Sequence, residues 1–187
     1  GLPGAQTFMI AVQRTVEPKI LQRHGTRWLS KLKSVLSDPQ ATKREKENAV
    51  NKYQHEQIKD TLNNMFLGKC AYCESEITAI SYGHIEHFWP KSKYVDKTFQ
   101  WENLLLACDK CNDTNHKGVK FPLDANGSPL LIDPTDGTTQ INQHLRFQWN
   151  EATLQADVVP LDERGREVVT IFDLNGDHDR KELREFR

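Results

Sequence analysis

All four cysteines of the chain lie in two Cys-x-x-Cys pairs, Cys70 with Cys73 and Cys108 with Cys111. Two such pairs bring four thiolates to the corners of a tetrahedron, which is how Zn²⁺ is held in a closed structural site. Metal binding then contributes folding free energy that a small hydrophobic core cannot supply. The spacing therefore predicts a Cys₄ zinc knuckle with an inserted element between its two halves.

Disulfide bonds are the other common use of four cysteines. Nothing in the sequence marks the chain as secreted, because residues 1–10 have neither the basic n-region nor the apolar h-region of a signal peptide. A thioredoxin-like redox role needs one Cys-x-x-Cys at the start of a helix, whereas this chain has two matched pairs. We therefore expect a cytoplasmic, zinc-binding protein.

Length and composition narrow the class of protein further. The chain has 187 residues, which suits one domain or one domain with appendages. With 37% hydrophobic and 27% charged residues it is expected to be soluble with a modest core. No segment approaches the roughly 18 apolar residues of a membrane helix, so we expect no membrane association. The net charge of -1 excludes a globally basic nucleic-acid coat.

Charge is distributed unevenly along the chain. Residues 1–60 contain 11 Lys and Arg against 6 Asp and Glu, whereas residues 121–187 contain 7 against 13. A basic N-terminal third is suited to face phosphates, and an acidic C-terminal third is suited to face solvent or a protein partner. Two solvated faces would give the same distribution, so both interpretations stay open.

Two helices are predicted near the N-terminus. Residues 18–36 place apolar side chains at three- and four-residue steps, and the Asp38–Pro39 pair ends that pattern. A second apolar stripe predicts a helix over residues 43–67 that Gly68 ends. Together these segments define an N-terminal helical region, residues 1–67.

Short apolar segments separated by turn residues follow Pro122. A small antiparallel sheet is predicted over residues 144–149, 153–159 and 167–172. Asp177 predicts the start of a final short helix from His178. The C-terminal extension is therefore expected to span 122–187, with 68–121 as the central domain.

The central domain contains candidate functional groups that the zinc knuckle does not need. Glu86, His87 and Asn103 lie between the cysteine pairs, and Asn112 and His116 follow the second pair. A closed Cys₄ site leaves no open position for chemistry, so any catalysis must use these other groups. The H-E-x-x-H and H-x-x-E-H motifs of zinc proteases are both absent.

Residues 68–121 resemble the HNH endonucleases, which have a ββα-metal active site. The motifs that carry the resemblance are Cys-x-x-Cys, Glu86-His87-x-x-Pro90, Asn103-Leu104 and Cys108-x-x-Cys111-Asn112 with a lysine shortly after. Segments Gly83–Ser92 and Leu104–Pro122 are most similar to the HNH subunit of Septu and retron-associated antiphage systems. The resemblance implies an α+β fold: a ββα-metal core with a Cys₄ zinc knuckle, flanked by N-terminal helices and a C-terminal small sheet and helix.

The resemblance also implies a role for each matched residue. His87 takes the position of the general base, and Asn103 that of the residue that fixes the loop carrying the base. Glu86 and Asn112 take the positions of the ligands for a catalytic divalent ion, although Glu86 is one methylene longer than the usual Asp. His116 lies four positions after Asn112, so it would share a face with Asn112 if this segment were helical, as a further ligand or a phosphate contact.

The chemistry of these residue types agrees with the implied roles. Oxygen ligands suit Mg²⁺ or Mn²⁺, whereas His116 as a third ligand would favour softer metals. A divalent ion would neutralise the charge that builds on a phosphodiester during cleavage. A neutral imidazole can take a proton from the attacking water. Lys91, Lys93 and Lys117 flank the motifs, and we expect either contact with the nucleic-acid backbone or simple solvation.

The resemblance implies two kinds of partner, a nucleic-acid substrate, either DNA or RNA, and an ATPase of the ABC/SMC-like type. A retron RNA–DNA component is a further candidate partner. The alternative function is a zinc-knuckle scaffold that binds protein or nucleic acid without catalysis. The combination of Glu86, His87 and Asn112 favours the nuclease, because a scaffold does not need these groups beside its zinc.

Overall fold

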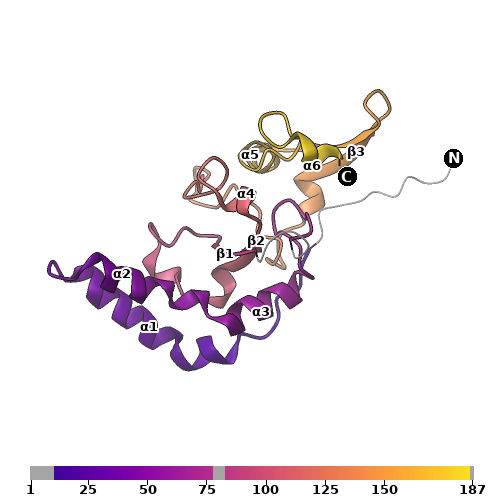
Figure 1. Ribbon diagram of the computed structural model, residues 1–187. Helices are drawn as coiled ribbons and strands as arrows, with labels where there is room; N and C mark the ends of the chain where they lie inside the picture. The colour runs from indigo at the N-terminus through magenta and orange to yellow at the C-terminus, as the bar shows by residue number, and fades with distance from the viewer. Residues whose placement is uncertain (1–10, 78–82, 186–187) are drawn as a thin grey trace. The chain divides into compact units, whose positions relative to one another are not determined.

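The computed structural model describes residues 11–77 and 83–185 (Figure 1). The expected absence of a signal sequence concerns residues 1–10, which lie outside the described part. The chain forms two compact units. We call Arg14–Ala71 with Glu76–Asp109 the first unit, and Gly1–Gln13 with Tyr72–Ser75 and Lys110–Arg187 the second unit. The division into regions 1–67, 68–121 and 122–187 stays a prediction.

The described residues of the first unit form three helices, three short 3₁₀ helices and two strands. Their bounds are α1 (Lys19–Ser37), α2 (Lys43–Val50), η1 (Asn51–Gln54), α3 (Glu56–Met65), β1 (His84–His87), η2 (Val95–Lys97), η3 (Trp101–Asn103) and β2 (Leu104–Ala107). Helix α1 agrees with the sequence pattern, because Leu21, Leu32 and Val35 are buried along one face. Figure 1 shows α2 folded back beside α1.

The single helix expected over residues 43–67 is broken into α2, η1 and α3. Tyr53 and Ile58 are both buried although five positions separate them, a spacing that a continuous 3.6-residue repeat would place on different faces. The break brings both side chains into the core. At the break, His55 is extended, and its side chain accepts the N–H of Gln57 at the start of α3.

Strands β1 and β2 form the antiparallel pair that positions the candidate site. The register places His84 opposite Ala107 and His87 opposite Leu104. All four residues of β2 are buried. Helix α3 packs on both strands, as Figure 1 shows. The short helix α4 (Asp109–Asn112) follows β2 in the chain, so the ββα order that the sequence predicted is present.

The second unit contains the C-terminal sheet and helices. Their bounds are η4 (Ile141–Gln143), β3 (Leu145–Asn150), β4 (Gln155–Pro160), α5 (Glu163–Ile171) and α6 (Lys181–Glu185). Strands β3 and β4 pair antiparallel, close to the predicted ranges.

The expected third strand over residues 167–172 is wrong, because this segment belongs mostly to α5. Val168, Ile171 and Phe172 are all buried, and their spacing of three and one positions fits one face of a helix. Asp162 caps the start of α5 by accepting the N–H of Gly165 at 2.8 Å.

The final helix begins at Lys181 rather than at His178, and Asp177 does not cap it. The preceding residues instead form a tight loop around the carboxylate of Asp173. That carboxylate accepts the backbone N–H groups of Asp177, His178, Asp179 and Arg180. We call residues 173–180 the Asp173 loop.

The described residues thus form a mixed fold of helices and two small antiparallel sheets. Within the described part of the chain, no helix is both long enough and apolar enough to cross a membrane.

Candidate metal centre and nuclease site

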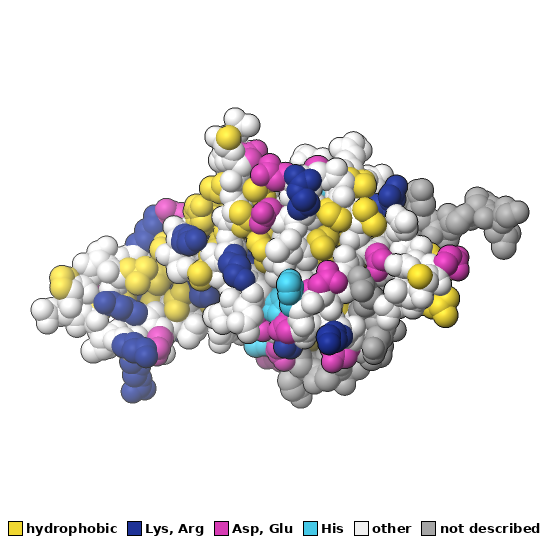
Figure 2. All heavy atoms as spheres, turned by 90° about the horizontal axis from the view of Figure 1, so that it is seen from above, with side chains coloured by type: hydrophobic (Ala, Val, Ile, Leu, Met, Phe, Trp, Pro, Cys, Tyr) yellow, Lys and Arg dark blue, Asp and Glu magenta, His cyan; other side chains and the backbone are white. Residues whose placement is uncertain are grey.

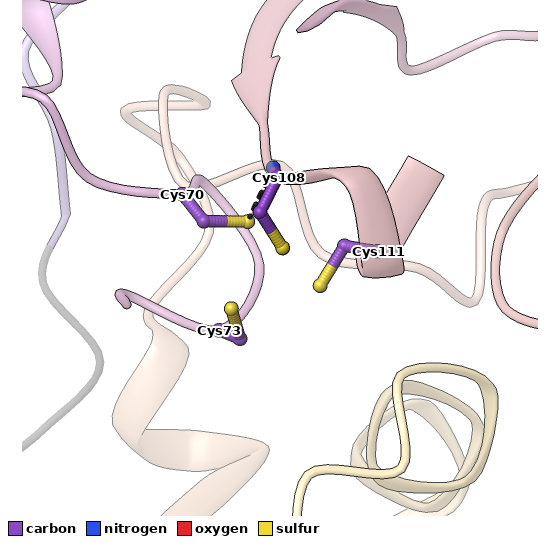
Figure 3. A group of neighbouring side chains, drawn as sticks. All are labelled: Cys70, Cys73, Cys108 and Cys111. Carbon is purple, nitrogen blue, oxygen red and sulfur yellow. Dashed lines mark hydrogen bonds between the residues drawn. The ribbon is translucent and has the colours of Figure 1, made fainter. Parts of the chain in front are cut away.

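The four cysteines form one cluster, as Figure 3 shows. Their Sγ atoms all lie within 4.8 Å of one another, and none of the four is in a disulfide bond. A tetrahedral zinc ion with Zn–S distances of about 2.3 Å requires sulfur atoms roughly 3.8 Å apart. The cluster therefore needs only a small contraction to hold a metal ion, and its all-thiolate donor set suits Zn²⁺.

Two hydrogen bonds from backbone N–H groups connect the Cys70–Ala71 segment to strand β2 and to Cys108, the residue that follows it. The N–H of Ala71 donates to the carbonyl of Leu106 at 2.8 Å. The N–H of Cys108 donates to Sγ of Cys70 at 3.4 Å, drawn as the dashed line in Figure 3. An N–H that points at sulfur favours the thiolate form, which is the form that binds metal.

His87 ends strand β1 and is only 3% exposed. Its Nε2 lies 3.0 Å from the carbonyl oxygen of Thr98. Because a carbonyl only accepts hydrogen bonds, Nε2 is the protonated nitrogen of the neutral ring and Nδ1 carries the basic lone pair. The ring of Tyr53 packs edge-on against the imidazole, with 4.5 Å between the ring centroids. The orientation and tautomer of His87 are thus set by its surroundings.

Asn103 fixes the segment that follows His87. Its Oδ1 accepts the N–H of Trp89 at 2.7 Å, and its Nδ2 donates to the carbonyls of Trp89 and Lys97, each at 3.0 Å. Asn103 is 2% exposed, and its three hydrogen bonds are partly shielded from solvent. The catalytic importance of this arrangement stays a prediction.

Glu86 precedes His87 in β1, pairs with Leu105 in the strand register, and is 6% exposed. It belongs to the first unit with His87, whereas Asn112 belongs to the second unit. The convergence of these three side chains on a divalent ion therefore stays a prediction.

His116 does not continue the helix that carries Asn112. Helix α4 ends at Asn112 and turns follow it, so the helical face expected to join the two residues is absent. His116 is buried instead between two carboxylates of the second unit. Its Nδ1 lies 3.0 Å from Oδ1 of Asp113, and its Nε2 lies 3.1 Å from Oδ1 of Asp179.

The carboxylate of Asp113 is held in its charged form. Burial opposes ionisation, but hydrogen bonds from the backbone and side chain of His116 outweigh it and lower the pKa of Asp113. A carboxylate on Nδ1 is the arrangement that orients a metal-binding imidazole. Sequence reasoning did not single out Asp113 or Asp179. The first lies beside Asn112 and could have been considered, whereas nothing local pointed to the second.

The three lysines expected near the substrate differ in exposure. Lys93 is exposed, and Lys91 is half-buried with its Nζ 5.1 Å from the ring centroid of Tyr53. Lys117 is completely buried at 0% exposure, which favours a structural role over contact with a nucleic-acid backbone. On the face drawn in Figure 2, Lys and Arg side chains form separate groups rather than one continuous basic surface.

Comparison with known families agrees with this geometry. Residues 70–118 match the family model described as HNH endonuclease, so this segment is an HNH domain as the sequence resemblance predicted. The matched segment begins at the first cysteine of the cluster and includes Glu86, His87, Asn103 and Asn112.

Two curated relatives extend the similarity beyond the HNH domain. The chain is 29% identical over 165 residues to the Septu protein PtuB of Bacillus mycoides (strain KBAB4), which covers 75% of this chain and 55% of the relative. It is 31% identical over 112 residues to the Septu protein PtuB of Bacillus thuringiensis, and this match covers 58% of this chain and 42% of the relative. The chain thus spans about half the length of the curated relatives it matches. No solved structure gives a significant match.

Proposed function

We propose that this chain is a metal-dependent HNH endonuclease that hydrolyses phosphodiester bonds in nucleic acid. The observation that carries the proposal is the environment of His87 within a segment that matches the HNH family. The imidazole is buried at the end of β1, its tautomer is set by Thr98, and the following segment is held by Asn103. A histidine that only packs in a core does not need such a support.

His87 acts as the general base in the proposed reaction. With Nε2–H held by the carbonyl of Thr98, Nδ1 takes a proton from the water that attacks phosphorus. The imidazolium that forms is stabilised by the same carbonyl, because the N–H···O bond strengthens when the ring becomes charged. General-base catalysis of this kind contributes typically 10²–10⁴-fold to the rate.

Glu86 and Asn112 are the proposed ligands of a catalytic Mg²⁺ or Mn²⁺. A carboxylate and a carboxamide offer the hard oxygen donors that these ions prefer. When bound, the ion neutralises the charge that develops on the phosphoryl oxygens during cleavage. His116 remains a third candidate ligand, but its Nε2 contacts Asp179, which would have to move or share the ion. Zn²⁺ in the cysteine cluster has a purely structural role.

Lys91 and Lys93 are the proposed contacts to the phosphate backbone. Lys93 is exposed, and the ammonium of Lys91 lies over the Tyr53 ring that packs on His87. This places one cation close to the general base, where a phosphodiester must bind for cleavage. The substrate is DNA or RNA, and low sequence specificity is expected because nothing in the sequence resembles a groove-reading helix.

We further propose that the nuclease is the effector of an antiphage defence complex in the cytoplasm. The support is the similarity to two proteins named Septu protein PtuB and the four free thiols, which persist in reducing compartments. An ATPase of the ABC/SMC-like type is the proposed partner, with a retron RNA–DNA component as a second one. The acidic residues of 121–187 are the proposed docking surface for the ATPase. Failure of the purified subunits to co-elute at low salt would remove the basis for that docking.

The test is a digestion assay on plasmid DNA and on RNA with Mg²⁺ or Mn²⁺, with and without the proposed ATPase. His87→Ala is expected to lower cleavage by about 10²–10⁴-fold while the protein still folds and keeps its zinc content. His24→Ala, in α1 of the same unit, is the matched control and should cleave normally. The variant is a cleaner control than EDTA, which can also remove structural zinc. Equal cleavage by wild type and His87→Ala would exclude His87 as the base and favour the scaffold alternative.

A further inference from the structure

We propose that Arg180 is a positioning residue of the cysteine cluster, and that the Asp173 loop is therefore part of the metal centre. The HNH match ends at residue 118, so this role lies outside the matched segment. The inference concerns metal retention, and it stands whether or not the chain cleaves nucleic acid. It rests on contacts within the second unit.

The guanidinium of Arg180 forms a hydrogen bond with one sulfur atom of the cysteine cluster. Its Nη1 donates to Sγ of Cys111 at 3.1 Å and to the carbonyl of Phe172 at 2.8 Å. Arg180 is only 6% exposed, which is unusual for arginine. A buried charge is stable only when it is paired and hydrogen-bonded. The thiolate of Cys111 provides that pairing.

The positive charge of Arg180 reduces the net negative charge of the metal-loaded cysteine cluster. Four thiolates around a divalent ion carry a net charge of about −2, which is costly to bury, and one guanidinium halves it. The guanidinium and the thiolates therefore stabilise each other's charged forms.

The conformation of the Asp173 loop positions this guanidinium beside Cys111. The carboxylate of Asp173 gathers the backbone N–H groups of the four residues 177–180, so the chain turns tightly before Arg180. Gly176 has φ +64°, and a Cβ there would lie 2.4 Å from the carbonyl oxygen of Arg180. Only glycine allows the loop to close this tightly.

Three further contacts connect the same region to segments at both cysteine pairs. Phe172 stacks on Tyr72, which lies between Cys70 and Cys73, with 4.2 Å between ring centroids and 18° between ring planes. Asp179 reaches Nε2 of His116 at 3.1 Å and Nζ of Lys110 at 3.5 Å. Residues 172–180 thus contact segments adjoining each pair, which a loop unrelated to the metal centre would not need to do.

The test compares Arg180→Met and Arg180→Lys with Arg166→Met, an exposed arginine on α5 of the same unit. Zinc affinity of the 187-residue chain is measured by competition with a chromophoric chelator. Arg180→Met is expected to bind zinc 10–100-fold more weakly, as is typical for loss of a residue that supports a metal ligand. Arg180→Lys should recover part of that loss, and Arg166→Met should equal wild type. A zinc affinity of Arg180→Met within twofold of wild type would overturn the proposal.

A spectroscopic measurement separates this role from simple packing. In protein loaded with Co²⁺, loss of the N–H···S bond raises the energy of the sulfur lone pairs, so the sulfur-to-cobalt charge-transfer band should move to longer wavelength. Arg180→Lys serves here even if Arg180→Met does not fold, because it keeps the charge while losing the planar donor geometry. Weaker zinc binding with an unshifted band in Arg180→Lys would show a purely structural contribution and would reject the proposal.

Discussion

Asn103 forms hydrogen bonds with both the backbone N–H and the backbone carbonyl of Trp89. Its Oδ1 accepts the N–H of Trp89 at 2.7 Å, and its Nδ2 donates to the carbonyl of the same residue at 3.0 Å. The carboxamide thus gives Trp89 the kind of hydrogen bonds that a neighbouring strand gives within a sheet. A third bond, from Nδ2 to the carbonyl of Lys97, ties the far end of the same segment to Asn103.

Replacing Asn103 with Ala removes all three bonds and takes this side-chain partner from partly buried backbone groups. Each such group costs about 1–3 kcal/mol, partly recovered by relaxation, so the free energy of unfolding should fall by about 2–4 kcal/mol. Urea unfolding measures this change. Asn64→Ala, at an exposed position of α3, should alter it by less than about 0.5 kcal/mol. A loss below about 1 kcal/mol in Asn103→Ala would contradict the supporting role of the carboxamide.

Replacing Glu86 with Gln keeps the shape of the side chain and removes its negative charge. If Glu86 is a ligand of the catalytic ion, Mn²⁺ affinity should fall at least about tenfold, because ligand charge sets the affinity of oxygen sites. Titration with Mn²⁺ followed by electron paramagnetic resonance measures this affinity, and zinc content should not change. Glu102→Gln, at an exposed position of the same unit, is the control. Equal Mn²⁺ binding by both variants would remove Glu86 from the ligand set.

Features with a local signal were predictable from the sequence. The apolar steps of residues 18–36 gave α1, and the two Cys-x-x-Cys pairs gave the cysteine cluster. The antiparallel pairing of β1 with β2 was implied by the HNH motifs, which lie on those strands and beside them. The first two were predicted from the spacing of residues in the sequence, and the third from the resemblance to a known family.

Features that depend on tertiary packing were not predictable. The break at His55 accompanies the packing of Tyr53 against His87, a contact between segments far apart in the chain. The segment 167–172 contains β-branched residues that favour a strand. The N-cap at Asp162 and the burial of one helical face stabilise helix α5 instead. The contact of Arg180 with Cys111 spans 69 positions and has no local signature.

Gly165 should not tolerate alanine. A Cβ at this position would lie 2.0 Å from the carbonyl oxygen of His144, so the start of α5 would have to move away from the sheet. Overpacking of this kind costs about 1–3 kcal/mol, which exceeds the gain in helix propensity of about 1 kcal/mol. Gly137→Ala is the matched control, because no atom lies within 4 Å of its Cβ position. Thermal unfolding should show a lower Tm for Gly165→Ala alone, and equal Tm values for both variants would contradict the clash.

The last prediction concerns the acid stability of the second unit. Asp162 accepts the N–H of Gly165 at 2.8 Å, and its Oδ2 lies 2.6 Å from Nδ1 of His144. Burial opposes ionisation of Asp162, but these two groups outweigh it, so its pKa in the folded protein lies below the usual 3.8. The unfolded chain therefore binds the proton more readily. The stabilisation is complete above pH 3.8 and is lost as pH falls through the lower pKa of the folded protein.

Two substitutions separate the charge of Asp162 from its capping role. Asp162→Asn keeps an N-cap oxygen and removes the titrating group, whereas Asp162→Ala removes both and should cost about 1 kcal/mol more. The free energy of unfolding measured from neutral pH into the acid range should show wild type more stable than Asp162→Asn at neutral pH. The two curves should approach each other as the pH falls below 3.8. A gap between them that stays constant over the whole range would show that the charge of Asp162 does not contribute to stability.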